Sequence, residues 1–298
     1  MTILKTVIFI DGQNFKKNLQ EFRFCPPATP TIPNPQGYRL DEKHFLWGNF
    51  FHDVIKKFDD LTGYQHRLIR SYWYNAESVS PFNVNNYRKV QSIVSKYRSD
   101  IPEVNDALVK KLAQDWYDRE RRNFYEGRDR VYDVIQKAVD FIEFKYVGQY
   151  KISPYRVFRF DKDVKTGRYT YFGMREGEKG VDVGIAIDMA SKMNGFDVAI
   201  LVSGDADFYP AVRYLKDGLK QVYQFSLAKG IPPNITYLSQ WLRSIVDIFA
   251  FFDEEELLTK YLNRNASIPY MIMKVINQRI QELASQKNPT PVVVSPPA

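Results

Sequence analysis

The sequence has a single cysteine, Cys25, so it can form neither an intramolecular disulfide nor a zinc site built from several cysteines. It has only three histidines, and their spacing matches no histidine metal site. Long apolar runs are lacking too: the longest, over residues 245–252, contains Asp247 and is too short to span a bilayer. The first residues lack the apolar stretch of a signal peptide. We therefore expect a cytoplasmic protein that does not bind membranes.

The composition is otherwise that of an ordinary globular protein, with 44% hydrophobic and 26% charged residues. A length of 298 residues favours one large domain, or one domain with a sizeable insertion. Lys and Arg outnumber Asp and Glu by 42 to 35, which leaves a formal net charge of +7. Because cationic side chains supply much of the affinity for phosphate backbones, this balance favours a polyanionic partner such as a nucleic acid.

Short apolar runs alternate with helical patterns in the first and last thirds of the chain. Residues 7–10 are apolar and end at Asp11, and we expect a short helix capped by Asn14 to follow. Strands that alternate with helices form parallel sheets, so the pattern predicts an α/β fold with a central, mostly parallel sheet. Further strands are expected over 67–74, 197–202 and 221–226, and a helix over 207–216.

The remaining segments depart from this alternation. Residues 25–37 contain five prolines and are expected to form an extended loop. Residues 78–150 carry long helical patterns, which predict a helical insertion, and residues 155–172 are typical of a β-hairpin. Helices are expected over 239–252, 254–262 and 268–285. The predicted domains are a core over 1–250 that holds the insertion, C-terminal helices over 251–285 and a disordered tail over 286–298.

Aspartates follow two of the expected strands. Asp11 comes directly after the first, and Asp205 and Asp207 come directly after the strand at 197–202. Ligands of parallel α/β sheets bind at the carboxyl ends of the strands, so these carboxylates are candidates for one site. Asp182 is a further candidate. The alternation of apolar residues over 181–189 is compatible with a strand, but a helix that begins near Val181 is favoured, and Asp182 would then lie in its first turn.

Several aspartates without neighbouring Cys or His form an oxygen-ligand set, which favours Mg²⁺ or Mn²⁺ over zinc. Such a set can support hydrolysis of a phosphodiester. Structural roles stay open for each residue: Asp11 as a turn residue, Asp207 as a helix cap, and Asp182 as a first-turn carboxylate that answers the helix dipole. Asp188 is expected to be a solvated or ion-paired helix residue.

Three segments together resemble a known family. Phe9-Ile10-Asp11-Gly12-Gln13-Asn14, Lys179-Gly180-Val181-Asp182-Val183 and Leu201-Val202-Ser203-Gly204-Asp205-Ala206-Asp207-Phe208 are similar, in this order, to the signature segments of NYN domains in the PIN-like ribonuclease superfamily. The resemblance implies a PIN-like α/β/α sandwich that cuts RNA with Mg²⁺ or Mn²⁺ held by Asp11, Asp182, Asp205 and Asp207. It also implies that Asn14 and Ser203 support this site, by hydrogen bonding or by positioning a metal-bound water. RNA is then favoured over DNA as the partner, and association into a homo-oligomer stays open.

The expected insertion offers a second candidate surface. Basic side chains can follow a phosphate backbone while aromatic rings stack on unpaired bases, so the insertion could clamp a substrate. The alternative is a solvated helix face, since Trp116 falls in line with apolar core positions and acidic residues offset much of the charge. The residues singled out for substrate contact are Lys179, Arg119, Arg121 and Arg122.

Two further functions compete with the nuclease. The first is a regulator that binds RNA or a nucleotide without cleaving it. The second is a phosphatase of the haloacid-dehalogenase type, which also places an aspartate after its first strand. That chemistry needs a second aspartate two residues later, where this chain has Gln13.

Overall fold

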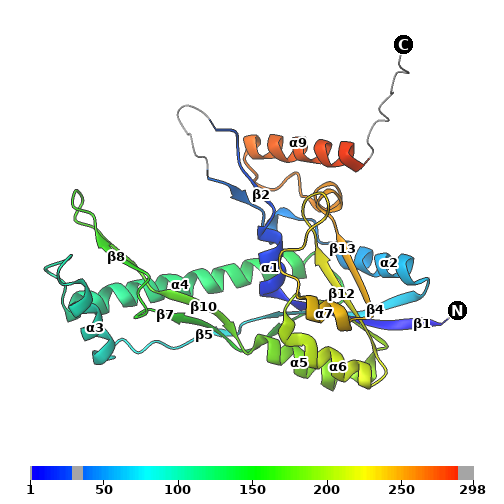
Figure 1. Ribbon diagram of the computed structural model, residues 1–298, viewed down its shortest axis with the longest axis horizontal. Coiled ribbons are helices and arrows are strands. Elements are labelled where there is room, and N and C mark those ends of the chain that lie inside the picture. Colours follow the sequence, from blue (N-terminus) through cyan, green and yellow to red (C-terminus); the bar gives the residue numbers. More distant parts are fainter. Residues whose placement is uncertain (1, 29–35, 288–298) are drawn as a thin grey trace, which may run out of the picture. The chain divides into compact units, whose positions relative to one another are not determined.

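A computed structural model describes residues 2–28 and 36–287, and these residues form two compact units. We call the first the sheet unit; it comprises Met1–Trp73, Asp133–Phe144 and Ile185–Ala298. We call the second the hairpin unit; it comprises Tyr74–Tyr132 and Lys145–Gly184 (Figure 1). Of the proline-rich loop expected over 25–37, residues 29–35 lie outside the described residues, and so do residues 288–298 of the tail expected over 286–298. The first two residues of that expected tail, Gln286 and Lys287, are instead helical.

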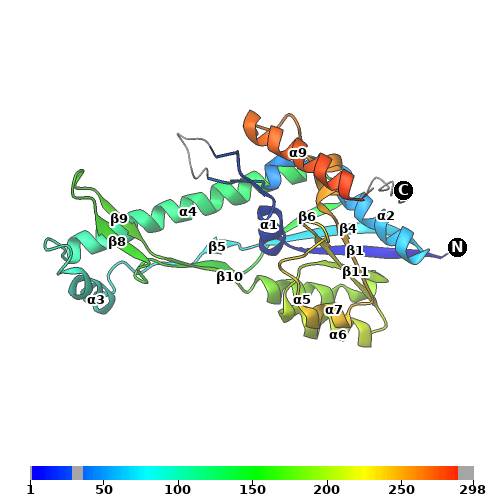
Figure 2. The ribbon, with the colours of Figure 1, turned by 45° about the horizontal axis from the view of Figure 1, so that its top comes forward.

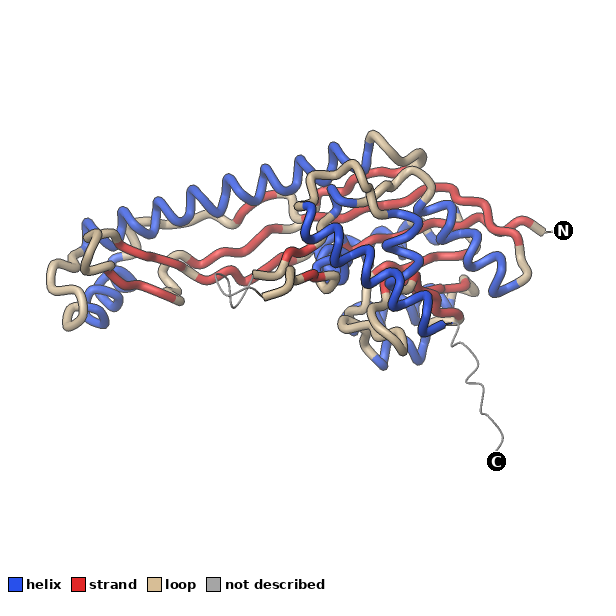
Figure 3. Tube along the Cα trace, turned by 90° about the horizontal axis from the view of Figure 1, so that it is seen from above, coloured by secondary structure: helices blue, strands red, loops and turns tan. Residues whose placement is uncertain are grey.

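The described part of the sheet unit is organised around a six-stranded sheet in the order β13-β12-β11-β1-β4-β6. The pairs β1–β11, β11–β12 and β12–β13 are all parallel, which confirms the expected α/β fold with a mostly parallel sheet. Figure 3 shows these strands running side by side. Their bounds are β1 Ile3–Asp11, β4 Gln65–Asn75, β6 Ile142–Tyr146, β11 Val198–Val202, β12 Gln221–Leu227 and β13 Ile248–Phe252.

Helices cover both faces of this sheet. On one face, Phe15 of α1 (Gly12–Gln20) lies 5.3 Å from the ring of Trp73, and Phe50 of α2 (Phe50–Thr62) lies 6.1 Å from that of Phe225. On the other, Phe9 packs against Phe196, which follows helix α5 (Val181–Ser191). Figure 2 shows α5, α6 (Tyr209–Asp217) and α7 (Gln240–Ile245) together below the sheet. The completely apolar β11 strand is buried because both faces are covered.

The sequence predicted where helices α1 and α5 begin, and the structure tests both predictions. The expected cap of α1 is wrong: Asp11, not Asn14, is the N-cap, and its carboxylate accepts the backbone N–H of Asn14. The strand runs up to Asp11 and the helix begins at the next residue, so Asn14 already lies in the first turn. The expected helix at Val181 is confirmed. Gly180 precedes it with a φ of 84°, a conformation that favours glycine.

The hairpin unit has its own core. Strands β10 (Met174–Lys179), β7 (Gln149–Ser153) and β5 (Ser78–Val79) form a small sheet, and β8 (Arg159–Lys162) pairs with β9 (Tyr169–Phe172) as the expected hairpin. The segment expected to be a helical insertion, residues 78–150, contains α3 (Tyr87–Tyr97) and α4 (Asp106–Gln136), together with strands. Trp116 of α4 is only 2% exposed and lies in this core, as the alternative interpretation predicted.

The C-terminal segment differs from its prediction. The helix expected over 239–252 ends at Ile245 as α7, and Ile248–Phe252 instead form the edge strand β13, paired with β12. These residues are β-branched or aromatic for the most part, and an open sheet edge gives them partners for their backbone groups. Beyond β13 lie α8 (Glu254–Glu256), a π-helical turn (Leu257–Tyr261) and α9 (Tyr270–Lys287). Among the residues described, no helix combines the length and apolar character needed to cross a membrane.

An ion pair attaches α9 to this region. The Arg279 guanidinium donates from Nη2 to Oε2 of Glu254 at 2.9 Å, and the Glu254 carboxylate is almost completely buried. We expect Arg279→Met to lower the free energy of unfolding by about 2–4 kcal/mol, because it leaves a buried carboxylate without its cation. Urea denaturation measures the change. Lys274→Met, on an exposed position of the same helix, is the control and should shift stability by less than about 0.5 kcal/mol. Equal effects of both variants would contradict the expectation.

Candidate functional site

The carboxyl ends of β1 and β11 meet through one serine hydroxyl. The two strands are parallel neighbours with Ile10 opposite Val202, so Asp11 and Ser203 are the next residues of each. The Ser203 hydroxyl donates to Oδ2 of Asp11 at 3.1 Å and accepts the backbone N–H of Asp205 at 3.2 Å. A single side chain therefore links the carboxylate at the end of one strand to the acidic loop at the end of the next.

Asn14 makes a second connection between these strand ends. Its backbone N–H donates to Oδ1 of Asp11 at 2.9 Å, and its side-chain Oδ1 accepts the backbone N–H of Gly204 at 3.2 Å. The same oxygen accepts an N–H from Asn18 one turn along α1. Asn14 thus holds the start of α1 against the loop that follows β11.

The three strand-end aspartates differ in exposure. Asp11 is 6% exposed, whereas Asp205 and Asp207 are open to solvent. Asp205 is the N-cap of the 3₁₀ turn Ala206–Phe208, and its Oδ1 accepts the backbone N–H of Asp207 at 3.0 Å. Capping is therefore done by Asp205, and the alternative role of Asp207 as a helix cap is wrong. The carboxylates form a series from the buried strand end to the surface.

Two residues that the sequence reasoning missed hold the loop in place. Gln224 of β12 is completely buried; its Nε2 donates to the carbonyl of Ser203 at 2.7 Å, and its Oε1 has no hydrogen bond within the described residues. A polar residue in the middle of a buried strand was the signal that could have identified it. Gly204 lies so close to the segment before α7 that an added Cβ would be 1.5 Å from the carbonyl oxygen of Tyr237. Its own carbonyl accepts the backbone N–H of Ser239 at 2.8 Å.

The contact at Gly204 makes a direct prediction. Gly204→Ala should lower the free energy of unfolding by about 2–3 kcal/mol, because a backbone carbonyl occupies the space that the new methyl group needs. Gly195→Ala is the matched control in the same unit. A Cβ there meets nothing within 4 Å, so a change of less than about 1 kcal/mol is expected. Thermal melts of the three proteins, followed by circular dichroism, give the comparison, and a Gly204→Ala protein as stable as wild type would contradict the packing described.

The other predicted site residues belong to the hairpin unit. Asp182 is half-buried in the first turn of α5, and Lys179 is exposed at the end of β10. The predicted set of four aspartates is thus divided, with three members in the sheet unit and one in the hairpin unit. The place of Asp182 in a common site remains a prediction. Asp188 pairs with Lys192 at 2.6 Å, as expected of an ion-paired helix residue.

The three arginines proposed for substrate contact are exposed on α4. The guanidinium of Arg119 lies 5.6 Å from the ring centre of Phe172, and that of Arg121 lies 5.9 Å from Tyr125. Arg121 and Arg122 also line a shallow hollow together with Asp118 and Tyr125. Cations and aromatic rings are therefore interleaved on this face, and its role in substrate binding remains a prediction.

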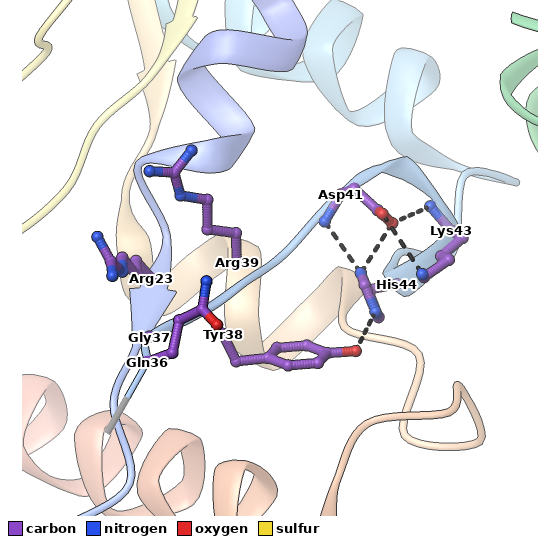
Figure 4. A pocket seen from close by; sticks show the side chains of 8 residues that line it. All are labelled: Arg23, Gln36, Gly37, Tyr38, Arg39, Asp41, Lys43 and His44. Atoms are coloured by element: carbon purple, nitrogen blue, oxygen red, sulfur yellow. Dashed lines mark hydrogen bonds and ion pairs between the residues drawn. The ribbon is translucent and has the colours of Figure 1, made fainter. Parts of the chain in front are cut away.

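The sheet unit also has a polar pocket of about 500 Å³ at the far end of α1. In Figure 4, the His44 ring lies between Tyr38 and Asp41: Nε2 is 2.8 Å from the Tyr38 hydroxyl, and Nδ1 accepts the backbone N–H of Asp41. Burial raises the pKa of Asp41, but the adjacent His44 ring, the Lys43 ammonium and the Lys43 backbone N–H outweigh it and leave the pKa below its ordinary value. The lining residues are Arg23, Gln36, Gly37, Tyr38, Arg39, Asp41, Lys43 and His44.

Two of the three histidines, His44 and His66, are engaged by contacts within the chain. Both ring nitrogens of His44 have partners, and so do those of His66, at Asp59 and Tyr223. Over residues 2–28 and 36–287, no three or more His, Cys, Asp or Glu side chains come together in a group that could hold an ion unaided.

Comparison with known protein families identifies one that matches this chain. The family model described as the NYN domain matches residues 83–253, more than half of the chain. The chain belongs to the NYN domain family. No curated protein matches. Among solved structures, a crystal structure of a protein of unknown function from Vibrio parahaemolyticus is 16% identical; the match covers 84% of this chain and 94% of that one, with a TM-score of 0.38.

Membership in the NYN family confirms the expected PIN-like fold. NYN domains are in general nucleases, so a nucleic acid is the substrate class that the family implies. The matched range contains the segments around Asp182 and Asp205 and begins after Asp11. The hydroxyl of Ser203, which lies within the matched range, joins Asp11 to that range.

Proposed function

We propose that this NYN protein is a metal-dependent endoribonuclease of the cytoplasm whose acidic set comprises Asp11, Asp182, Asp205 and Asp207. The observation that carries the proposal is the Ser203 hydroxyl, which connects the carboxylate after β1 to the acidic loop after β11. In parallel α/β sheets this edge is where ligands bind. A net charge of +7 supports an RNA substrate, since a polyanion is attracted to the protein as a whole.

The residues present fit a hard divalent cation. The strand-end donors are all carboxylate oxygens, without a thiolate or imidazole among them, and this chemistry favours Mg²⁺ or Mn²⁺. Mg²⁺ in particular keeps several waters and binds through one or two carboxylates plus substrate phosphates, so a complete cage of protein ligands is not required. In the sheet unit, one or two of Asp11, Asp205 and Asp207 would hold the cation directly, and water would complete its coordination. Asp182 is included in the set because of the family resemblance.

The cation would lower the pKa of water and neutralise phosphoryl oxygens. The residues of the chain hold the carboxylates in position. Ser203 and Asn14 donate to different oxygens of Asp11, which fixes the orientation of the carboxylate. Asp205 and Asp207, open to solvent, are accessible to a substrate phosphate.

The acidic residues are tested by isosteric substitution. We expect Asp11→Asn and Asp205→Asn each to reduce Mn²⁺-dependent cleavage of RNA by more than about a hundredfold, because residues that merely orient metal ligands already cost 10- to 100-fold when they are replaced. The asparagine oxygen can still accept the capping N–H of Asn14 or Asp207, so both variants should fold. Cleavage of a mixed RNA pool and of a mixed DNA pool, with and without Mn²⁺, measures the effect.

Asp217→Asn, at the exposed end of α6, is the control and should cleave like wild type. Asp182→Asn tests the fourth aspartate separately. Full activity of the Asp11 and Asp205 variants, or of wild type in excess chelator, would contradict the proposal.

Ser203 is a positioning residue in this scheme. Ser203→Ala should reduce cleavage by about 10- to 100-fold and raise the Mn²⁺ concentration needed for half-maximal activity, since the Asp11 carboxylate loses one of its donors. A purely structural role would lower stability without changing the Mn²⁺ requirement. Ser191→Ala, which removes an exposed hydroxyl on α5, is the matched control.

A non-catalytic nucleic-acid-binding regulator is the second candidate function. It is favoured by the absence, within the described residues, of any group of three or more potential metal ligands. Binding of RNA in a filter assay, combined with failure to cleave any RNA or DNA in Mg²⁺ or Mn²⁺, would support it over the nuclease.

A further inference from the structure

A hollow of about 660 Å³ lies beside the exposed aspartates of the sheet unit. It is formed where the 3₁₀ turn Ala206–Phe208, α6 and α7 pack together. Figure 1 shows α6 and α7 next to each other. The hollow has aromatic and apolar walls and one carboxylate. Its lining residues are Ala206, Asp207, Tyr209, Pro210, Trp241 and Ser244.

Trp241 is the unusual member of this hollow. Its side chain is 74% exposed, whereas the chain's three other tryptophans, Trp47, Trp73 and Trp116, are at most 2% exposed. Within the described residues its indole makes no ring–ring or cation–π contact. A large aromatic ring left open in a concave surface is typical of a binding site.

The backbone fixes Trp241 near the acidic loop. Trp241 is the second residue of α7, whose N-cap is Ser239. The Ser239 backbone N–H donates to the carbonyl of Gly204, the residue before Asp205, and Gly204 permits this close approach because it lacks a Cβ. Main-chain contacts thus hold the backbone at the start of α7, which carries Trp241, against the loop that contains Asp205 and Asp207.

We propose that this hollow binds an unpaired base of a single-stranded nucleic acid, beside the phosphate that is cut. The proposal rests on the nuclease function proposed above and names its substrate class. The base would stack on Trp241, with Tyr209 forming a second aromatic surface. Asp207 lines the same hollow, so a base bound there places the adjoining phosphate at the proposed catalytic carboxylates.

A base fits this hollow better than a phosphate does. The lining is largely apolar and aromatic, and no cationic side chain is among the residues that form it, so a phosphate would find no partner of opposite charge inside the hollow. Every base offers a π face for stacking, and most offer N–H groups that a carboxylate can accept. Arg213 is exposed one helical turn after Tyr209 and can contact the backbone of the same strand. A base inside a duplex cannot enter, because its faces are already stacked.

Trp241 is itself the probe for the test. Because the other three tryptophans are buried, acrylamide quenching of tryptophan fluorescence reports chiefly on Trp241. A ten-nucleotide RNA of mixed sequence, titrated into the full-length protein in the presence of a chelator, should change the fluorescence and protect it from acrylamide without being cleaved. The same RNA annealed to its complement should do neither.

Trp241→Ala should weaken binding of the single strand by about tenfold, measured by anisotropy of a labelled strand, whereas Trp241→Phe should keep most of the affinity. Tyr270→Ala removes an equally exposed ring, 80% exposed at the start of α9, and should bind like wild type. Equal binding of duplex and single strand, no change in fluorescence, or unchanged affinity of Trp241→Ala would overturn the proposal.

The two proposals fail in distinguishable ways. Protection of Trp241 by the single strand, without cleavage in Mn²⁺, would overturn the nuclease function and leave the base-binding hollow supported. Mn²⁺-dependent cleavage that Trp241→Ala leaves unchanged in KM would support the nuclease and overturn the hollow. In cleavage by the intact protein, the Trp241→Ala effect should appear in KM for single strands more than in kcat, because the ring does not touch the reacting atoms.

Discussion

The Ser203 hydroxyl is the interaction on which the arrangement of the site depends. It donates a hydrogen bond to the carboxylate of Asp11 and accepts one from the backbone N–H of Asp205. It therefore joins two strand ends that are 192 residues apart in sequence. The parallel pairing of β1 with β11 brings the two ends to the same edge of the sheet. Gln224 then holds the carbonyl of Ser203 from the next strand, which leaves the serine little freedom to turn away.

Two further contacts extend this constraint to the helices. Asn14 ties α1 to the backbone of Gly204, and the carbonyl of Gly204 ties the start of α7 to the same loop. Hydrogen bonds therefore join the segments near residues 14, 204 and 239 into one cluster. Groups of different exposure are thereby brought together at this edge of the sheet. They are a buried carboxylate at the strand end, two exposed carboxylates in the following loop and an exposed indole on α7.

Much of this arrangement could be predicted from local sequence, and what could not depends on tertiary contacts. The apolar runs before Asp11 and Asp205, the turn at Gly167 and the helix beginning at Val181 all carry period or turn signals that the fold follows. The edge strand β13 was mistaken for a helix, because its five residues gain their strand partners only from β12. Three further features depend on residues that are distant in sequence, so a local pattern cannot predict them. They are the cap of α1, the role of Gln224 and the exposed position of Trp241.

Anomalous diffraction from crystals soaked in Mn²⁺ would locate a bound cation directly. A peak within about 2.5 Å of carboxylate oxygens from both Asp11 and Asp205, retained in the Asp217→Asn protein and lost in Asp11→Asn, is the expected result. A fully occupied Mn²⁺ bound elsewhere, with these two carboxylates holding only their hydrogen bonds to the chain, would show that Ser203 assembles a structural contact and that the strand ends are not a metal centre.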